Sequence, residues 1–296
     1  MTGIDAAPSP LSKSLRLVTW NVDMDTVNGR SRWRHIALQL SELLPDVVLL
    51  QEVSARPPED TTGAEGPWGS TSLEVFQRAL GSRYELAYDV GAADAEAYFV
   101  AAAVRRDRFR VLEYEYTEFE NTVQGRGLLN VLLASVGDAA WRVRVLTAHL
   151  ESGAEASAVR QAQLAAVVDA MVSVPEQASV FGGDTNLRAK EVPAGLFRVP
   201  AAASTGDILR DAFVEAGEPP TLRYTWDTFR NHNKRDLRGK HRGARARYDR
   251  IFTTSHWSAR SLRLLGTERL GSGVFPSDHF GLFAELGWCS TRRLPR

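Results

Sequence analysis

The stretch SVFGGDTNLRAKEV, residues 179–192, holds an acid and an amide at a spacing that suits chemistry. An apolar run of strand-forming residues ends there in two glycines, and Asp184 and Asn186 follow two positions apart. Side chains at positions i and i+2 of an extended chain point the same way. Glycine, aspartate and asparagine also favour plain turns, so the motif alone leaves both a turn and a functional pair open.

Other segments also place polar residues where a predicted strand ends or is about to begin. Ligand sites in sheet proteins favour strand ends. Taken singly, each position also fits a structural role, such as a turn, a solvated strand end or a hydrogen-bonded core histidine. Their coincidence at five strand ends favours one shared site. Besides Asp184 and Asn186, the residues are Asn21 in VTWN, Glu52 in LLQE, His149, Glu151 and Ser152 in LTAHLES, and Asp278 and His279 in FPSDH.

The residue types of these segments select a class of chemistry. Carboxylates with an amide oxygen suit a hard cation held partly by water, which describes Mg²⁺ better than Zn²⁺. The two histidines supply donors for a phosphate and a route for protons. The chain contains no GxxxxGK[ST], GxSxG or HExxH motif, which argues against a P-loop site, a serine hydrolase and the commonest zinc protease. Metal-assisted hydrolysis of a phosphate ester remains.

The sequence between these residues predicts the elements that must carry them. Residues 32–44 and 157–172 show helical periodicity or good helix formers, and 45–53 is a continuous apolar run typical of a strand buried on both faces. Strands occur in runs without strict alternation with helices, which favours a layered α/β fold of largely antiparallel sheets. The predicted strands are 15–20, 45–53, 97–104, 127–136, 141–150, 178–184, 248–255 and 280–288, and the predicted helices are 32–44, 72–80, 157–172 and 207–217.

Composition limits what else the protein is expected to be. The 296 residues are 44% apolar and 24% charged with a formal net charge of zero, the profile of an ordinary globular protein. The single cysteine, Cys289, excludes an intrachain disulfide and a cysteine-based zinc cluster. Residues 1–14 are expected to be a disordered lead-in, and residues 15–290 to form one domain. We expect a soluble, intracellular monomer without a membrane partner, nuclear in a eukaryote or cytoplasmic in a bacterium.

The order of the motifs resembles a known superfamily. TWN, LLQEV, TAHLES, GGDTNLR, RYDRIF and PSDHFGL, in that order, are similar to the endonuclease/exonuclease/phosphatase superfamily. Within it, GGDTNLRAKEV, TAHLES and YTWDT resemble the type-2 tyrosyl-DNA phosphodiesterases, which hydrolyse the 5′-phosphotyrosyl bond left when a topoisomerase is trapped on DNA. The resemblance covers residues 15 to 288. It implies a four-layer α/β sandwich of two packed sheets flanked by helices.

The resemblance also implies a role for each catalytic residue. Asp184 would position and deprotonate the attacking water, helped by Asn186. His279 would donate to the phosphate, with Asp249 holding its ring in orientation, as carboxylates behind histidines do elsewhere. His149 would contact the non-bridging oxygens. A phenolate with a pKa near ~10 leaves readily, so little acid help is needed at the tyrosine oxygen.

The resemblance implies further residues for the cofactor and the substrate. Glu52 would hold Mg²⁺, for which Mn²⁺ could substitute, with Asn21 beside it and Asp278 touching the metal through water. The substrate would be DNA carrying a 5′-tyrosyl adduct on a single-stranded 5′ end. The residues expected to contact it are Ser152, Trp226, Tyr98, Arg188 and Arg126.

The motifs assign no function to two of the predicted loops. Residues 230–247 are strongly basic, which fits either an arm that contacts DNA phosphates or a solvated loop. Because the loop lies between two motif segments of the site, DNA contact is favoured. Residues 54–72 are rich in proline and glycine and longer than the resemblance suggests. The motifs also leave other substrates open: a general nuclease, a deadenylase, or a small phosphodiester such as an inositol phosphate or sphingomyelin. A non-catalytic binding module on a phosphoesterase scaffold is a further alternative, against which all the expected catalytic residues stand.

Overall fold

The structure is a computed structural model, and it describes residues 13–25, 28–57, 68–94, 98–174, 178–192, 209–234 and 243–289. Lys13 and Ser14, the last residues of the expected lead-in, are described, and Ser14 already begins the first strand. Residues 1–12 of that prediction lie outside the described residues. None of the helices within these ranges is long and apolar enough to cross a membrane.

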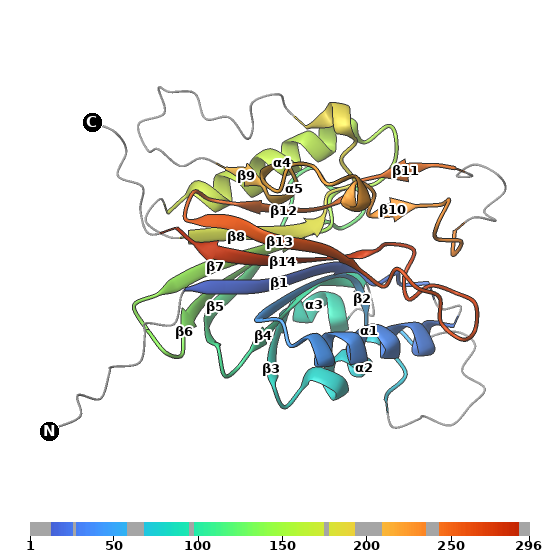
Figure 1. Cartoon of the computed structure of the whole chain (residues 1–296), viewed down its shortest axis with the longest axis horizontal. Coiled ribbons are helices and arrows are strands. Elements are labelled where there is room, and N and C mark those ends of the chain that lie inside the picture. The colour runs from blue at the N-terminus through green and yellow to red at the C-terminus, as the bar shows by residue number, and fades with distance from the viewer. Residues whose placement is uncertain are drawn as a thin grey trace, which may run out of the picture.

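Two six-stranded sheets form the centre of the fold (Figure 1). The described strands pair in parallel between β1 and β2 and between β7 and β8, and antiparallel in the other ladders. The first sheet runs in the order β13 (Trp257–Leu265), β14 (Gly281–Trp288), β1 (Ser14–Asn21), β2 (Val47–Ser54), β4 (Tyr98–Arg105) and β3 (Tyr84–Tyr88). The second runs β5 (Phe109–Glu118), β6 (Gly127–Ser135), β7 (Arg142–Ala148), β8 (Ala178–Asp184), β12 (Asp249–Thr253) and β9 (Arg210–Asp211), and β10 (Trp226–Asp227) pairs separately with β11 (Arg245–Ala246).

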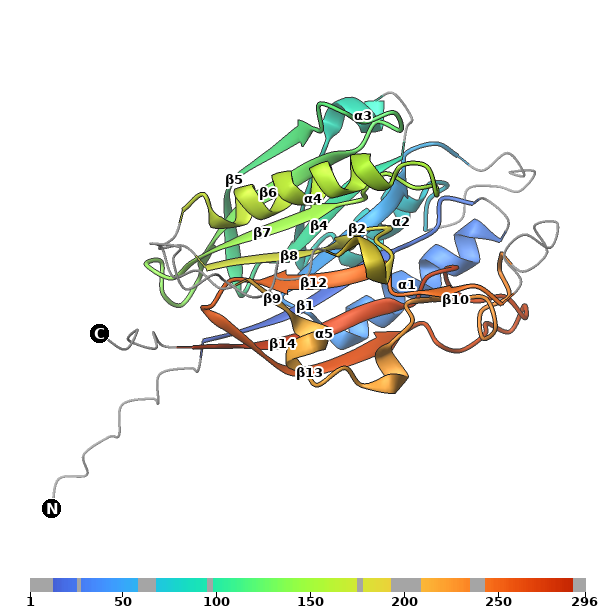
Figure 2. The same ribbon diagram turned by 90° about the horizontal axis from the view of Figure 1, so that it is seen from above.

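Helices cover the outer faces of both sheets (Figures 1 and 2). The first sheet is covered by α1 (Gly29–Leu43) and α2 (Ser72–Leu80), and the second by α4 (Ser157–Val172). The shorter helices are α3 (Val90–Asp94) and α5 (Ala212–Glu215), with 3₁₀ turns at Ala189–Glu191 and Pro220–Leu222. The expected α/β sandwich of largely antiparallel sheets is confirmed.

Three apolar clusters hold the layers together. One lies between the sheets and joins residues such as Leu17 of β1 to Val145 of β7. The second packs Trp33 of α1 against the outer face of the first sheet, and the third packs Leu164 of α4 against the second. Burial of apolar area on both faces explains why the central strands read as continuous apolar runs.

The sheets approach each other closely beneath the polar end of the sandwich. A Cβ at Gly182 of β8 would lie 3.1 Å from Cβ of Thr19 and 3.0 Å from Cδ1 of Leu49 in the facing sheet. A Cβ at Gly183 would meet the backbone oxygen of Ala148 at 2.3 Å. Gly182 therefore lets β8 lie directly against β1 and β2 of the facing sheet, and Gly183 lets it lie close to its own neighbour β7.

The predicted helix over 207–217 is wrong. Residues 207 and 208 lie outside the described residues, Arg210 and Asp211 pair with β12, and only Ala212–Glu215 is helical. The side chain of Asp211 accepts from the backbone N–H of Phe213, so the helix begins after it. Strands β3, β5 and β13 had no counterpart in the sequence prediction.

Candidate active site

The first sheet delivers two site residues from adjacent parallel strands. Asn21 ends β1 opposite Gln51 of β2, which places Glu52 one residue further along the edge. Glu52 has φ 59°, a left-handed conformation in the ladder that few side chains adopt, and the β2–β4 register shifts at this point. The irregularity lets Glu52 face Asn21, whose Nδ2 donates to Glu52 Oε1 at 3.0 Å.

The second sheet delivers the acids and one histidine. Asp184 at the end of β8 lies opposite Asp249, the first residue of β12. His149 continues β7 by one residue and pairs with Asp184 as a parallel bridge. The backbone N–H of Leu150 donates to the carbonyl of Asp184 at 2.9 Å, which fixes this extension of β7 against β8.

His279 enters from the segment that precedes β14. The Oγ of Ser277 donates to the backbone oxygen of Asn21 at 2.6 Å and accepts from the backbone N–H of His279 at 3.1 Å. His279 also forms a bridge to Trp226 of β10, whose Nε1 donates to Asp278 Oδ2 at 3.3 Å. Contacts on both sides therefore hold the ring over the end of the second sheet.

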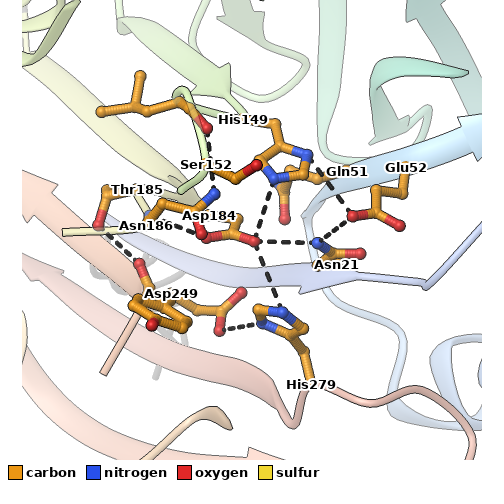
Figure 3. A network of polar contacts seen from close by, with 12 residues as sticks. Asn21, Gln51, Glu52, His149, Ser152, Asp184, Thr185, Asn186, Asp249 and His279 are labelled. Carbon is orange, nitrogen blue, oxygen red and sulfur yellow. Dashed lines mark hydrogen bonds and ion pairs between the residues drawn. The ribbon is translucent and has the colours of Figure 1, made fainter. Parts of the chain in front are cut away.

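One carboxylate oxygen is the point on which these groups converge (Figure 3). Oδ2 of Asp184 accepts from Nδ2 of Asn21 at 2.9 Å and lies 3.3 Å from Nε2 of His149 and 3.7 Å from Nε2 of His279. Its other oxygen accepts from the backbone N–H of Asn186 at 2.9 Å. Asp184 is 1% exposed, so it is a buried acid facing three polar side chains.

The two histidines have opposite charge preferences. Burial and the adjacent guanidinium of Arg126 hold the pKa of His149 well below its usual range, so His149 is neutral at pH 7. Burial also disfavours a charge on His279, but the carboxylates of Asp249, Asp184 and Asp278 raise its pKa well above the usual range. Nδ1 of His279 lies 2.8 Å from Oδ2 of Asp249. His279 is therefore a cation held by a buried acid.

Two carboxyl groups carry negative charge that the protein does not fully balance. Burial raises the pKa of Asp184 to about 6, with Asp249 adding to the rise. Burial, Asp23 and Glu52 raise the pKa of Asp278 to about 7, against the opposing charges of His279 and Lys234. A divalent cation beside Glu52 and Asp278 would compensate this charge, and oxygen donors are the ligands that Mg²⁺ prefers. The residues present fit such an ion.

A second set of groups is also close enough to ligate a metal. Asp184, Asp249 and His279 each bring one ligand atom within 4.8 Å of the others. His279, however, directs Nδ1 at Asp249 and is the protonated member of that pair, and an imidazolium has no lone pair for a metal. Asn21 directs its Nδ2 donor, which cannot bind a metal, at the carboxylates of Glu52 and Asp184. Glu52 and Asp278 are therefore the direct candidates for binding a cation.

Aromatic and basic residues surround the convergent acid. The guanidinium of Arg126 lies 4.9 Å from the ring centroid of Tyr98, and its Nη1 is 2.7 Å from Nδ1 of His149. On the other side, the ring centroid of Tyr248 lies 5.7 Å from that of Trp226 and 6.3 Å from that of His279. The site thus has an aromatic wall on each side.

Two residues expected to contact the substrate, Ser152 and Arg188, and one expected to help Asp184, Asn186, lie at the edge of this arrangement. Ser152 is half-buried, and its Oγ donates to Oε1 of Gln124 at 3.0 Å. Arg188 is half-buried and donates its backbone N–H to Glu191 at 2.9 Å. Asn186 has φ 49° and turns its Nδ2 to the backbone oxygen of Leu150 at 3.1 Å, so its side chain braces β7 rather than touching the Asp184 carboxylate.

Sequence reasoning missed a buried ion cluster behind Asn21. Asp23, 3% exposed, donates its backbone N–H to Oδ1 of Asn21 at 3.0 Å. Its carboxylate lies 3.1 Å from Nη1 of Arg32 and 3.1 Å from Nζ of Lys234, and Lys234 also pairs with Asp25 at 3.1 Å. The sequence signal for this cluster was weak. Asp23 lies two residues after Asn21, and that spacing is also typical of a simple turn in which an asparagine side chain accepts from the backbone two residues on.

The basic loop is described only at its two ends, residues 230–234 and 243–247. Arg230 lies over the ring of Phe280 at 5.0 Å, and Arg245 lies over Phe229 at 4.1 Å and pairs with Asp227 at 3.3 Å. Arg235, Arg238, Lys240 and Arg242 lie outside the described residues, as do residues 58–67 of the loop at 54–72.

Comparisons with known proteins agree with this geometry. Residues 18–279 match the model of the endonuclease/exonuclease/phosphatase family. The chain is 35% identical over 295 residues to tyrosyl-DNA phosphodiesterase 2 of Mus musculus, covering 96% of this chain and 70% of the relative. It is 34% identical over 277 residues to the Homo sapiens protein of the same name, covering 91% of this chain and 67% of the relative.

Solved structures give the same result. The crystal structure of D. rerio tyrosyl-DNA phosphodiesterase 2 complexed with single-strand DNA product matches with a TM-score of 0.76 and 30% identity, covering 93% of this chain and 99% of that one. The C. elegans structure matches with a TM-score of 0.75 and 28% identity over 94% of this chain and 77% of that one. The chain therefore belongs to the endonuclease/exonuclease/phosphatase family, in its tyrosyl-DNA phosphodiesterase 2 branch.

Proposed function

We propose that this protein is a metal-dependent phosphodiesterase that hydrolyses the 5′-phosphotyrosyl bond between DNA and a trapped topoisomerase. The observation that carries the proposal is the convergence of Asn21, His149 and His279 on one oxygen of the buried Asp184. An acid so placed, between a neutral and a charged imidazole, suits attack of water on a phosphate. Family membership and the name of the relatives supply the class of substrate.

Asp184 is the proposed general base. Its pKa, raised to about 6, leaves it ionised at neutral pH yet basic enough to take a proton from an attacking water. The hydrogen bond from Asn21 orients Oδ2, and the backbone N–H of Asn186 orients Oδ1. The leaving tyrosine phenolate, with a pKa near ~10, needs little protonation as the bond to phosphorus breaks.

The histidines are the proposed donors to the phosphate. His279 carries its proton at Nε2 toward the region beside Asp184, while Asp249 holds Nδ1 and keeps the ring charged. His149 offers a neutral N–H from the opposite side. As negative charge moves onto the non-bridging oxygens, these donors are already oriented and lose little free energy to reorganisation.

Glu52, with Asn21 beside it and Asp278 nearby, is the proposed holder of Mg²⁺, with Mn²⁺ as a substitute. The ion, when bound, supplies positive charge to the phosphate oxygens. Glu52 accepts a hydrogen bond from the backbone N–H of Met24 at 3.0 Å and from Asn21 at 3.0 Å, so the chain fixes both of its oxygens before any ligand binds.

The aromatic walls are the proposed contact with a single-stranded 5′ end. Stacking on aromatic rings combined with cations holds single strands without reading their sequence. Tyr98 with Arg126, and Trp226 with Tyr248, provide rings on both sides of Asp184. Ser152, Arg188 and the basic loop would contact phosphates further along the strand. Residues 15–290 would act as one catalytic domain in a monomeric protein.

The experiment that tests this proposal is tyrosine release from a 5′-phosphotyrosyl oligonucleotide, with Mg²⁺ or with EDTA. A 3′-phosphotyrosyl oligonucleotide and an unmodified duplex are measured beside it. We expect Mg²⁺-dependent release from the 5′ adduct alone. Asp184→Asn should lower kcat about 1,000-fold, within the range for loss of a general base. Asp169→Asn, an exposed carboxylate on α4, is the matched control and should leave kcat unchanged.

Other results would contradict specific parts of the proposal. Equal cleavage of the plain duplex would leave the hydrolytic mechanism and reject the substrate. Release of tyrosine at the same rate in EDTA would reject the metal requirement. Binding of the adduct without turnover in Mg²⁺ would indicate a non-catalytic module on this fold.

A further inference from the structure

Glu151 is a buried carboxylate beside the site that none of the steps above uses. It lies two residues after His149 and is 2% exposed. Oε1 accepts from the backbone N–H of Val123 at 2.9 Å, and Oε2 accepts from Oγ1 of Thr122 at 2.9 Å and Nε2 of Gln163 at 3.3 Å. A carboxylate buried with donors on both oxygens holds those donors in place, because releasing them would leave a buried charge unpaired.

The donors that Glu151 holds belong to the turn that joins β5 to β6. Thr122 accepts from the backbone N–H of Arg126 at 2.7 Å through the same hydroxyl that donates to Glu151. The side chain of Val123 is 88% exposed, so the turn is held at this point by its backbone and not by apolar burial. Glu151 therefore holds the backbone N–H of Arg126 through Thr122, while the backbone N–H of Phe119 donates to the Arg126 oxygen at 2.9 Å.

Arg126 in turn determines which nitrogen of His149 carries the proton. Its Nη1 lies 2.7 Å from Nδ1 of His149 in a buried contact. A guanidinium has only donors, so Nδ1 must accept, and a neutral imidazole must then carry its hydrogen on Nε2. Nε2 is the nitrogen that faces Oδ2 of Asp184 at 3.3 Å. Gln124 fixes the guanidinium from the other side, with Oε1 accepting from Arg126 Nη2 at 3.1 Å.

We propose that Glu151 is a positioning residue that acts through the β5–β6 turn and Arg126 to keep His149 in the tautomer protonated at Nε2. With the turn displaced, Nδ1 loses its donor and the tautomer protonated at Nδ1 becomes accessible, with a lone pair instead of a hydrogen directed at the reacting phosphate. The kinetic consequence rests on the proposed function, whereas the tautomer itself does not.

The chain offers a substitution that separates this role from packing. Glu151→Gln preserves the size of the side chain but replaces one acceptor oxygen by an NH₂ group, which then faces either the N–H of Val123 or the hydroxyl of Thr122. Thr122→Val removes the hydroxyl that links Glu151 to the Arg126 backbone and keeps the shape of the residue. Glu155→Gln, an exposed carboxylate four residues further on, is the matched control.

The direct test is a long-range ¹H–¹⁵N correlation spectrum of protein labelled at histidine nitrogen. The chain has six histidines, so the signals of His149 can be identified with a His149→Gln variant. In the wild type and in Glu155→Gln we expect His149 to be protonated at Nε2 alone. In Glu151→Gln and in Thr122→Val we expect the nitrogen shifts to move toward a mixture of both tautomers.

Kinetics on the 5′-phosphotyrosyl oligonucleotide supply the second readout. We expect kcat to fall about tenfold in Glu151→Gln and in Thr122→Val, the lower end of the cost of losing a residue that orients a site histidine. An unchanged tautomer in a folded Glu151→Gln or Thr122→Val protein would overturn the inference, even where thermal stability falls. If the tautomer shifts while the wild type cleaves no 5′ adduct, the inference holds and the proposed function is rejected.

Discussion

His149 and His279 lie on opposite sides of the same carboxylate oxygen, 3.3 and 3.7 Å from it, yet the protein gives them opposite charges (Figure 3). Both rings are buried, at 5% and 7% exposure, so burial alone does not distinguish them. The difference lies at Nδ1. In His149 it contacts the guanidinium of Arg126 at 2.7 Å, with the carboxylate of Glu52 further away at 3.8 Å, whereas in His279 it contacts the carboxylate of Asp249 at 2.8 Å. The group behind each ring therefore decides whether the ring is neutral or charged.

This difference follows from which elements meet behind each histidine. Arg126 belongs to the turn before β6, the neighbour of β7, from which His149 extends. Asp249 is the first residue of β12, the neighbour of β8, and its carboxylate contacts Nδ1 of His279. Two parts of one sheet, on either side of β7 and β8, thus supply opposite charges to two rings that share Asp184. The arrangement gives the site a fixed proton donor and a neutral donor at the same pH.

Among the groups that surround the two rings and Asp184, the largest expected effect comes from removing the acid that contacts Nδ1 of His279. Asp249→Asn should lower kcat about 100-fold, because the variant loses both the orientation and the charge of the ring. The carboxylate raises the pKa of His279, so its removal lowers that pKa, and the protonated ring is lost at a lower pH. The pH–rate profile of kcat should therefore lose activity on its alkaline side at lower pH than the wild type.

Nuclear magnetic resonance can limit this prediction to one histidine. The tautomer of His149 should stay unchanged in Asp249→Asn, because Arg126 remains in place. An alkaline limb that does not move in Asp249→Asn would show that His279 is not the titrating donor.

A smaller effect concerns the carboxylates that face the histidines. Raised folded-state pKa values of about 6 for Asp184 and about 7 for Asp278 mean that the metal-free protein loses stability as pH rises through these values. Mg²⁺ binds the ionised form, so it should raise Tm more at pH 8 than at pH 5. At 100 times its Kd, a ligand adds about 2.7 kcal/mol.

Differential scanning calorimetry with and without Mg²⁺ measures this effect. Glu52→Gln should reduce the Mg²⁺-dependent rise in Tm, whereas Glu155→Gln should leave it unchanged. A rise in Tm of equal size at pH 5 and pH 8 would contradict the raised pKa values of Asp184 and Asp278 on which this prediction rests.

The smallest expected effect on activity comes from the buried ion pair between Arg160 and Glu191, which contacts the chain two residues after His149. Nη2 of Arg160 lies 2.8 Å from Glu191, and its Nη1 donates to the backbone oxygen of Glu151 at 3.0 Å. Although burial opposes it, the hydrogen bonds from Arg160 and from the backbone of Arg188 lower the pKa of Glu191 to about 2. This pair stabilises the folded state at neutral pH, and the contribution is lost as pH falls from about 4.5 to about 2.

Glu191→Gln should therefore lower the free energy of unfolding at pH 7 by about 3 kcal/mol at most, with the difference shrinking in acid. We expect kcat to change less than about threefold, because the substitution leaves the groups at Nδ1 of both histidines in place. Urea unfolding at pH 7 and pH 3 gives the measurement. A difference in stability that grows as pH falls would contradict the ion pair.

The sequence predicts most of the elements that carry the site, because central strands and amphipathic helices leave strong patterns. Helices α2 and α4 and strand β8 have the predicted bounds. The missed strands β5 and β13 lie at sheet edges, where FRVLEYEYTE and WSARSLRLL carry many exposed polar residues. A register shift in each strand also interrupts its apolar alternation. The helix predicted over 207–217 failed because Asp211 is drawn into pairing with β12.

The site itself was predictable only in part. Strand ends identify Asn21, Glu52, His149 and Asp184, because parallel or adjacent strands bring their ends to one edge. The resemblance already implied Asp249 as the partner of the His279 ring, but the sequence does not contain the partner of the His149 ring. Arg126 lies in a turn with no recognisable pattern, and its contact with His149 joins residues 23 positions apart through the fold. Glu151 was visible in TAHLES, but its partners were not.

The pairing of β1 with β14 determines when the site can form during synthesis of the chain. The first strand and the last described strand are neighbours, so the segment of Trp20 and Asn21 contacts the segment of Ser277 and His279 only after the C-terminal part of the chain has been made. Glu52, His149 and Asp184 can emerge and fold earlier, but the acid has no charged imidazole beside it until then. A nascent or prematurely terminated chain should therefore be unable to cut nucleic acid, and activity begins only with the complete fold.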